Sequence, residues 1–403
     1  MRLPSGQGGR PLWARIVRIA LIVLGVAVVV AAAVLLATVS FRNQADTAEF
    51  VRTKLARAGV PGAAIVMTSG EEIAWTSSFG YADVEHERPV TAETRFQLAS
   101  VSKTVTGTAV MQLAERGLVG LDQDISTVLP FAIVHPEHPD VPITIRMLLT
   151  HSSSISEQSE PYESLYTIGS GGGDSPVTLE EVARGFLTEG GRWYADGANF
   201  ADTAPGTARA YSNVGYALLG YIVEVVSRDS FPDYCRENIF EPLGMDSATW
   251  MLADTDLDRL AVPYEGRSER LPFYSFATYP DGTLRATAED YAAFLIAMLN
   301  GGALHGNRIL EPETVHLMLG GGSPGGGTPL TWHPDPLGDL GLYAPDGEVL
   351  GHTGGDPGVF TVAMFNPVRR TGLVVLMNSS PAINLRVLNL WLMMRRLIEE
   401  TGL

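Results

Sequence analysis

Apolar residues gather in short runs near both ends of the chain, and this pattern predicts β-strands there. Residues 63–68 and 73–79 flank the turn Ser69-Gly70-Glu71, as expected for a β-hairpin. Three more strands are predicted near the C-terminus, at residues 351–355, 359–365 and 372–377. Strands at both ends of the chain indicate one sheet to which the two termini contribute.

A period close to 3.6 residues predicts the helices between and around these strands. The first ends at Gly59 before Pro61, a normal helix stop, and the last places Leu390 and Leu397 largely on one stripe. We therefore predict an α+β fold in which an antiparallel sheet of N- and C-terminal strands is flanked by helices, with a mostly helical subdomain inserted at about 117–271. The helices are expected at residues 46–59, 100–117, 214–226, 287–299 and 384–400.

The longest apolar run lies outside this pattern, at residues 16–39. It is long enough to cross a bilayer as a helix, and arginines but no acidic residues precede it. The positive-inside rule then predicts a cytoplasmic basic segment at 1–15, a single-pass membrane anchor at 16–39, a tether at 40–48 and an extracytoplasmic domain at 49–403. A cleaved signal peptide is the main alternative, because residues 31–37 are rich in small side chains.

Charge and cysteine content narrow the classes of partner and of site. The chain carries a formal charge of −17, and its first 42 residues hold five arginines and no acid, so removing them leaves −22 on the exported part. Such a surface repels nucleic acid, and we predict no nucleic-acid partner. Cys235 is the sole cysteine, which excludes an internal disulfide and a thiolate metal cluster. The exported domain must therefore be stabilised by packing.

Lysine occurs only twice in this chain, and one of the two stands where it can do chemistry. Lys54 belongs to a solvated helical face, whereas Lys103 follows Ser100 by three residues in the segment Ser100-Val101-Ser102-Lys103. The hydroxyl of Ser100 is well placed to cap the predicted helix, and residues three apart lie about 5 to 6 Å apart at Cβ on one helical face. A lysine amine in this position can take the proton of a serine nucleophile.

Two later segments carry side chains that complement this pair. Tyr211 and Asn213 follow Pro205-Gly206-Thr207, and a phenol beside a cationic lysine can share the role of base. The other segment is His352-Thr353-Gly354-Gly355, which begins a predicted strand and whose glycines let a substrate lie against the backbone. Each segment alone is a weak signal, but their order and spacing predict a catalytic site.

Together these segments resemble the serine β-lactamase and penicillin-binding-protein superfamily, in particular its class C-like serine hydrolase branch. The resemblance covers almost everything from about residue 46 to the C-terminus. It includes the Ser100 to Lys103 segment and the segments LLTHSSS (148–154), PGT (205–207), YSN (211–213), FEPLGM (240–245) and GHTGG (351–355).

The resemblance implies a catalytic role for three residues and a substrate-binding role for Asn213. Ser100 would be the acylated nucleophile. Lys103 and Tyr211 would be the base pair that activates Ser100 and later serves the leaving group and the hydrolytic water. Asn213 would orient Lys103 and the substrate amide. Neither a cofactor nor a metal is implied.

The resemblance also implies how the substrate would be held. The backbone N–H groups of Ser100 and Gly355 would form an oxyanion hole, and one such donor is typically worth about 3 to 4 kcal/mol. His352 and Thr353 would face the far end of the substrate, and Gly354 would belong to the same substrate-binding strand.

Two departures, at His352 and Ser154, limit what the resemblance carries over. His352 stands where many β-lactamases have a lysine that attracts the substrate carboxylate, which makes antibiotic hydrolysis less favoured. Ser154 stands where the family commonly has glycine, so the loop after His151 is expected to take a different path. His151 is interpreted as structural, hydrogen-bonded under this loop. The acids and histidines at 135–140 are interpreted as a solvated loop, because two prolines break any register for a metal site.

These features predict a membrane-anchored serine hydrolase that acts outside the cytoplasm on an amide or an ester. Its substrates would be small molecules or short peptides, including cell-wall peptides. We rank D-amino-acid peptides and small esters above β-lactams, and this ranking rests on analogy. The alternative is a non-catalytic protein that keeps the pocket in order to bind cell-wall peptides or partners.

Overall fold

The computed structural model describes residues 47–157, 160–195, 198–321, 327–338, 342, 348–380 and 387–403. Contacts divide the chain into two units, Met1–Val51 and Arg52–Leu403, and the predicted site lies in the second. The predicted anchor at 16–39 lies outside the described residues. Within the described ranges, no helix is both long enough and apolar enough to span a bilayer.

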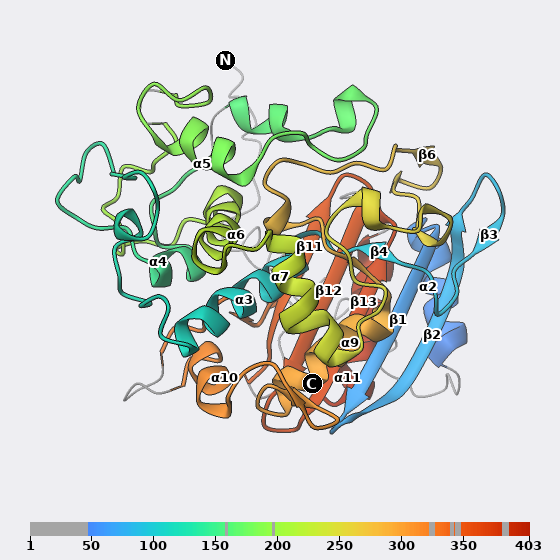
Figure 1. The fold of residues 1–403 in the computed structure, drawn as a ribbon. Helices are drawn as coiled ribbons and strands as arrows, with labels where there is room; N and C mark the ends of the chain where they lie inside the picture. The colour runs from blue at the N-terminus through green and yellow to red at the C-terminus, as the bar shows by residue number, and fades with distance from the viewer. Residues whose placement is uncertain are drawn as a thin grey trace, which may run out of the picture. The chain divides into compact units, whose positions relative to one another are not determined.

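One antiparallel sheet of seven strands runs through the second unit (Figure 1). β1 pairs with β2 on one side and with β13 on the other, so that Ala64 lies opposite Leu376. N- and C-terminal strands therefore share one sheet, as predicted, although β2 extends beyond the predicted strand. In spatial order the strands are β10 (His333–Pro334), β11 (Leu350–Asp356), β12 (Val359–Asn366), β13 (Thr371–Met377), β1 (Gly62–Ser69), β2 (Glu72–Asp83) and β3 (Arg88–Pro89).

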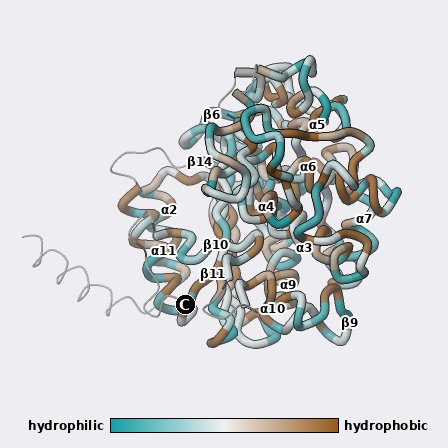
Figure 2. The backbone as a smooth tube through the Cα atoms, turned by 90° about the vertical axis from the view of Figure 1, so that its left-hand side faces the viewer, coloured by the Kyte–Doolittle hydropathy of each residue, from teal (hydrophilic) through white to brown (hydrophobic). Residues whose placement is uncertain are grey.

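Helices cover both faces of this sheet. α11 (Val387–Thr401) lies on one face, and α3 (Lys103–Glu115), α6 (Asn213–Ser227) and α9 (Ala288–Leu299) lie on the other (Figures 1 and 2). The first eleven residues of α3 are all buried, including its polar side chains. This burial places the start of α3 between the sheet and α6, which is where the predicted nucleophile lies.

The predicted insertion at 117–271 contains helices, long loops and a small β-structure. Its helices are α4 (Ile145–Leu149), α5 (Leu179–Leu187), α6, α7 (Phe231–Cys235) and α8 (Glu241–Leu243), with a π-helical turn at Arg236–Phe240. The other helices include α2 (Thr47–Ala58) and α10 (Pro312–Met318). The remaining strands are β4 (Phe96–Gln97), β5 (Tyr264–Glu265), β6 (Glu269–Arg270), β7 (Arg285–Ala286), β8 (Ala303–Leu304), β9 (Asn307–Arg308) and β14 (Ser379–Ser380).

Candidate active site

Ser100 lies in a single 3-10 turn, η1 (Ala99–Ser102), which runs directly into α3. The predicted capping role of Ser100 is wrong, because no side chain caps the start of α3 and the Ser100 hydroxyl is a hydrogen-bond partner of the lysine below it. Ala99 has a positive φ of 47°, which is strained for a residue with a Cβ. Strand β12 holds the turn, since the Thr361 hydroxyl donates to the Leu98 carbonyl at 2.6 Å. The turn thus presents Ser100 at a fixed position.

Lys103 is fully buried beneath this turn, and oxygen atoms surround its ammonium group. Nζ donates to Ser100 Oγ at 3.0 Å, to Asn213 Oδ1 at 2.7 Å and to the Asp281 carbonyl at 2.8 Å. An ammonium has three protons, so these contacts use all of them. Burial lowers the pKa of Lys103, but charge on Tyr211 when ionised and on Asp281 raises it above its ordinary value overall. The free site therefore holds Lys103 as a cation.

Glu157 fixes the orientation of Asn213 at the start of α6. The Ser212 side chain caps this helix by accepting from the Gly215 N–H at 2.9 Å. Glu157 accepts from the Ser212 hydroxyl at 2.8 Å, from Asn213 Nδ2 at 3.0 Å and from the Val214 N–H at 2.7 Å. Asn213 Oδ1 therefore has to face Lys103. The sequence analysis missed Glu157, which precedes Asn213 by 56 residues and belongs to no recognised motif.

Three carboxyl groups lie close to this single lysine, and two of them titrate near neutral pH. Burial raises the pKa of Glu157 to about 7, although its hydrogen bonds oppose the shift. Burial also raises the pKa of Asp356 to about 7, and the charge of Asp281 adds to this effect. The pKa of Asp281 is raised by burial against the opposing attraction of Lys103. Because one cation balances only one carboxylate, Glu157 and Asp356 take up protons as the pH falls through 7.

We expect kcat/KM to fall as the pH drops below about 7. We assign this acid limb of the pH profile to Glu157. Ionised Glu157 accepts from Asn213 Nδ2, and a protonated carboxyl cannot accept at both oxygens equally well. Since the pKa is raised to about 7, the ionised form is lost as the pH falls through that value. Glu157→Gln should lower kcat/KM by about 10- to 100-fold and abolish the limb. Asp356→Asn, the matched control, should keep the limb, and an unchanged limb in Glu157→Gln would contradict the assignment.

Tyr211 lies at the surface of the site, with 41% of its area exposed. Its ring stacks on His151, with centroids 4.3 Å apart and an interplanar angle of 27°. Lys103 Nζ lies 5.1 Å from the centroid of the Tyr211 ring. The phenol is therefore held beside the lysine cation and open to a substrate, as the predicted base pair requires.

His151 and Ser154 shape the loop beneath Tyr211. His151 Nδ1 accepts from the Ser212 N–H at 3.1 Å, which agrees with the interpretation of His151 as a structural residue. Ser154 has a positive φ of 63°, a conformation that glycine adopts at no steric cost. The Ser154 hydroxyl donates to the Thr203 carbonyl at 2.5 Å. This hydrogen bond ties the loop to the segment that precedes Tyr211.

An open cavity of about 820 Å³ begins at the nucleophile. Ser100, Tyr211, His352, Thr353 and Gly355 all line it, so the structure brings these predicted residues together. Lys103 contacts Ser100 from beneath, and Asn213 contacts Lys103; neither residue lines the cavity. Further lining residues are Leu149, Thr150, Arg209, Trp332, His333 and Asp335.

Gly354 differs from the other predicted site residues, because it faces the nucleophile turn. A Cβ on Gly354 would lie 2.5 Å from the Leu98 carbonyl oxygen and 2.9 Å from the Ser100 nitrogen, whereas a Cβ on Gly355 would meet nothing within 4 Å. We expect Gly354→Ala to lower the free energy of unfolding by about 1 to 3 kcal/mol and to reduce activity by displacing Ser100. Gly355→Ala keeps its backbone N–H and should keep the wild-type Tm. Equal Tm values for the two variants in thermal denaturation would contradict this packing.

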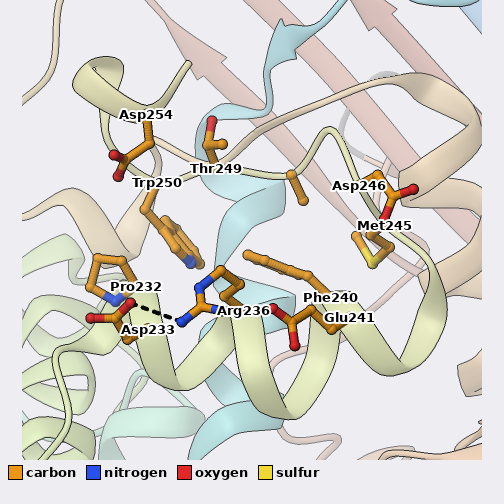
Figure 3. A pocket seen from close by; sticks show the side chains of 11 residues that line it. Pro232, Asp233, Arg236, Phe240, Glu241, Met245, Asp246, Thr249, Trp250 and Asp254 are labelled. Carbon is orange, nitrogen blue, oxygen red and sulfur yellow. Dashed lines mark hydrogen bonds and ion pairs between the residues drawn. The ribbon is translucent and has the colours of Figure 1, made fainter. Parts of the chain in front are cut away.

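A second cavity, of about 440 Å³, lies beside α7 and α8 (Figure 3). Trp250 and Phe240 form part of its wall, and Arg236 forms ion pairs with Asp233 at 3.2 Å and with Glu241 at 2.6 Å. It shares no lining residue with the cavity at the nucleophile, and its lining includes no serine, histidine, lysine or cysteine. The side chains of this second cavity therefore offer no serine and lysine pair of the kind found at Ser100.

An antiparallel sheet flanked by helices, with a Ser-x-x-Lys pair entering a buried helix, defines the β-lactamase and transpeptidase class of serine hydrolases. The chain belongs to the Beta-lactamase family, whose sequence profile matches residues 47–395. Penicillin-binding protein 4 of Amycolatopsis lactamdurans is 31% identical over 238 residues, which cover 57% of each chain. The matches span about half the length of the curated relatives.

Solved structures share this fold across most of the chain. The octameric penicillin-binding protein homologue from Pyrococcus abyssi matches with a TM-score of 0.70 and 28% identity, over 88% of this chain and 77% of that chain. EstCE1, described as a hydrolase with promiscuous acyltransferase activity, matches with a TM-score of 0.67 and 22% identity, over 89% of this chain and 100% of that chain. At that identity, the likeness to EstCE1 shows the fold alone.

Proposed function

We propose that this chain is a membrane-anchored, extracytoplasmic serine hydrolase that cleaves an amide or ester bond through an acyl-enzyme on Ser100. The observation that carries the proposal is the contact of Lys103 Nζ with Ser100 Oγ at 3.0 Å and with Asn213 Oδ1 at 2.7 Å, directly beneath an open cavity. A binding protein would have no need for a buried cation at the oxygen of one half-buried serine that lines a cavity. The proposed roles of the site residues follow from this contact.

In the acylation step, Ser100 Oγ attacks the substrate carbonyl carbon. Its proton passes to the Lys103 and Tyr211 pair, in which ionised Tyr211 accepts the proton and cationic Lys103 stabilises the negative charge that develops on Ser100 Oγ. The carbonyl oxygen becomes an oxyanion that accepts from the N–H groups of Ser100 and Gly355. Collapse of this intermediate breaks the bond to the amine or alcohol, and the leaving group takes the proton from the pair.

In the deacylation step, a water molecule repeats this sequence with Ser100 as the leaving group. The Lys103 and Tyr211 pair takes a proton from the water, and the hydroxide attacks the ester carbon of the acyl-enzyme. Collapse breaks the bond between the acyl carbon and Ser100 Oγ, and the pair returns a proton to Ser100. The free acid then leaves through the cavity, whose exposed donors include Tyr211 and Arg209.

We rank D,D-peptidase, D-aminopeptidase and esterase activities above β-lactam hydrolysis. His352 is 2% exposed and its Nδ1 donates to the Thr353 carbonyl at 2.6 Å. Burial lowers the pKa of His352 well below its ordinary value, so this side chain is neutral at pH 7. A neutral imidazole lacks the charge with which a lysine at this position attracts a carboxylate.

The full chain in detergent should be incubated with a fluorescent penicillin, a chromogenic short-chain ester and a peptide ending in D-Ala-D-Ala. Covalent penicillin labelling that requires Ser100, together with peptide turnover, would place the enzyme among peptidoglycan-directed hydrolases. Ester turnover without labelling would support an esterase. Stoichiometric acylation with no turnover of any substrate would favour the alternative, a cell-wall peptide-binding protein. The absence of both labelling and turnover would overturn the proposal.

We expect the full chain to sediment with membranes and to resist extraction with carbonate, because residues 16–39 form the proposed anchor. A form that begins at residue 47 should remain in the supernatant. Protease added outside spheroplasts should degrade the domain, since the basic segment at 1–15 keeps the N-terminus in the cytoplasm. A mature N-terminus near residues 31–37 would instead show a cleaved signal peptide.

A further inference from the structure

Three histidines from separate parts of the chain meet at one wall of the main cavity. His333 lies on β10, His352 lies on the neighbouring strand β11, and His151 follows α4. The ring centroids of His333 and His352 are 4.7 Å apart, and those of His151 and His333 are 5.8 Å apart. One nitrogen of each ring lies within 4.8 Å of a nitrogen of the other two. The catalytic steps proposed above use none of these nitrogens.

The hydrogen bonds of His352 leave a lone pair on its second nitrogen. A carbonyl oxygen can only accept, so the 2.6 Å contact with Thr353 places the proton of neutral His352 on Nδ1. Nε2 is then an acceptor, and it is buried without a hydrogen-bond partner among the described residues. A histidine that ligates a metal usually donates its other N–H to a carbonyl or carboxylate in this way. His352 is thus arranged as a metal ligand.

His151 has the opposite tautomer and offers a donor to the same space. A backbone N–H can only donate, so the contact from Ser212 places a lone pair on His151 Nδ1 and the proton on Nε2. His151 is 1% exposed, and its Nε2 also has no partner in the part of the chain that the structure describes. A buried donor that lacks a partner costs free energy. A bound water or hydroxide would satisfy it.

His333 completes the group from the open side of the cavity. It is half-buried, and Arg209 Nη2 lies 3.3 Å from its Nδ1 and 3.4 Å from its Nε2. Because a guanidinium can only donate, a ring nitrogen of His333 serves as the acceptor for this exposed arginine.

We propose that His333 and His352 bind a divalent transition-metal ion, with His151 Nε2–H donating to a water molecule on that ion. Neutral imidazoles suit zinc and its neighbours in the first transition row. The two ligands would replace two waters of the hydrated ion, and Arg209 would move into solvent. The bound ion would lie in the cavity that Ser100 and Thr353 line, so it would compete with substrate. The site would make the enzyme sensitive to free zinc.

The pair His135 and His138 provides a matched control from the same chain. Their ring centroids are 4.9 Å apart, close to the spacing of the proposed ligands. However, His135 Nδ1 accepts from the Glu137 and His138 N–H groups, and Nε2 lies 2.9 Å from the Ala201 carbonyl. Both nitrogens of His135 are therefore used, and this pair should not bind an ion.

The test titrates the full-length Ser100→Ala variant with cobalt(II), followed by visible absorption, and with zinc, followed by calorimetry. We expect one ion per chain. Binding should be at least about tenfold weaker when His333→Asn is combined with Ser100→Ala, and unchanged when His138→Asn is combined with it. Arg209→Gln should bind more tightly, because it removes a competing cation. Since Ser100→Ala needs no turnover, failure of the proposed hydrolase activity would leave this result intact.

Two results would overturn the site. One is the absence of stoichiometric binding in a folded protein, and the other is a His333→Asn variant that binds as tightly as its parent. His333 is half-buried on a two-residue strand, so a thermal melt of each variant separates a lost ligand from a lost fold. In the active chain, zinc should inhibit competitively, and His333→Asn should weaken that inhibition by the same factor as binding.

Discussion

Ser100→Ala is expected to lower the hydrolysis of every substrate by at least about 10³-fold, because removal of a nucleophile abolishes the covalent route. The hydroxyl supplies the atom that is acylated, and it is the cavity-lining hydroxyl to which Lys103 Nζ donates. The residual rate would come from substrate binding and from the oxyanion donors. Steady-state kinetics and mass spectrometry of the trapped acyl-enzyme, which should be absent in the variant, check this result.

Folding should survive this change, and a second serine provides the control. Lys103 keeps two of its three acceptors in Ser100→Ala, namely Asn213 Oδ1 and the Asp281 carbonyl. Ser152 is half-buried, and its Oγ lies 2.9 Å from Thr150 Oγ1 in the loop near the cavity. Ser152→Ala should therefore keep wild-type turnover. Turnover retained in Ser100→Ala, or lost to the same extent in Ser152→Ala, would refute Ser100 as the nucleophile.

The sheet could be predicted from the sequence because its strands are apolar on repeating positions and turn residues separate them. A sheet shared by N- and C-terminal strands followed from the presence of strands at both ends of the chain, and the structure forms it by pairing β1 with β13. The two-residue strand β10 was missed, since so short a segment has no periodicity. The start of α3 was misjudged at Ser100, because the preceding turn depends on contacts of Leu98 with Thr361, which are distant in sequence.

The predicted site residues were those that belong to recognisable motifs, and the missed residues act through tertiary contacts. Glu157 and Asp281 are ordinary acids in the sequence, and only the fold brings them to Asn213 and Lys103. The predicted roles of Lys103 and Tyr211 as a base pair stay predictions. In the proposed mechanism Lys103 starts as a cation among three acceptors, so it acts first as a charge, and Tyr211 carries more of the base role.

Lys103→Met should abolish turnover and also destabilise the fold, and the second effect should depend on pH. Lys103 and Asp281 form a buried ion pair at 3.4 Å, with side-chain exposures of 0% and 4%. Removing one partner of such a pair typically costs about 3 to 5 kcal/mol. The pKa of Asp281 is already raised by burial, and loss of the cation raises it further. Protonation of Asp281 at low pH should therefore reduce the loss of unfolding free energy in this variant.

The sign of this pH dependence follows from linkage. A carboxyl whose folded pKa exceeds its unfolded value destabilises the fold increasingly as the pH rises from the unfolded to the folded pKa. Lys103→Met should thus lose more Tm relative to wild type at pH 7.5 than at pH 5. The double variant Lys103→Met/Asp281→Asn should recover stability at pH 7.5 but no activity, which separates the chemical role of Lys103 from its role in folding. Equal Tm losses at both pH values would show that Asp281 is not the buried carboxylate that loses its counter-charge in Lys103→Met.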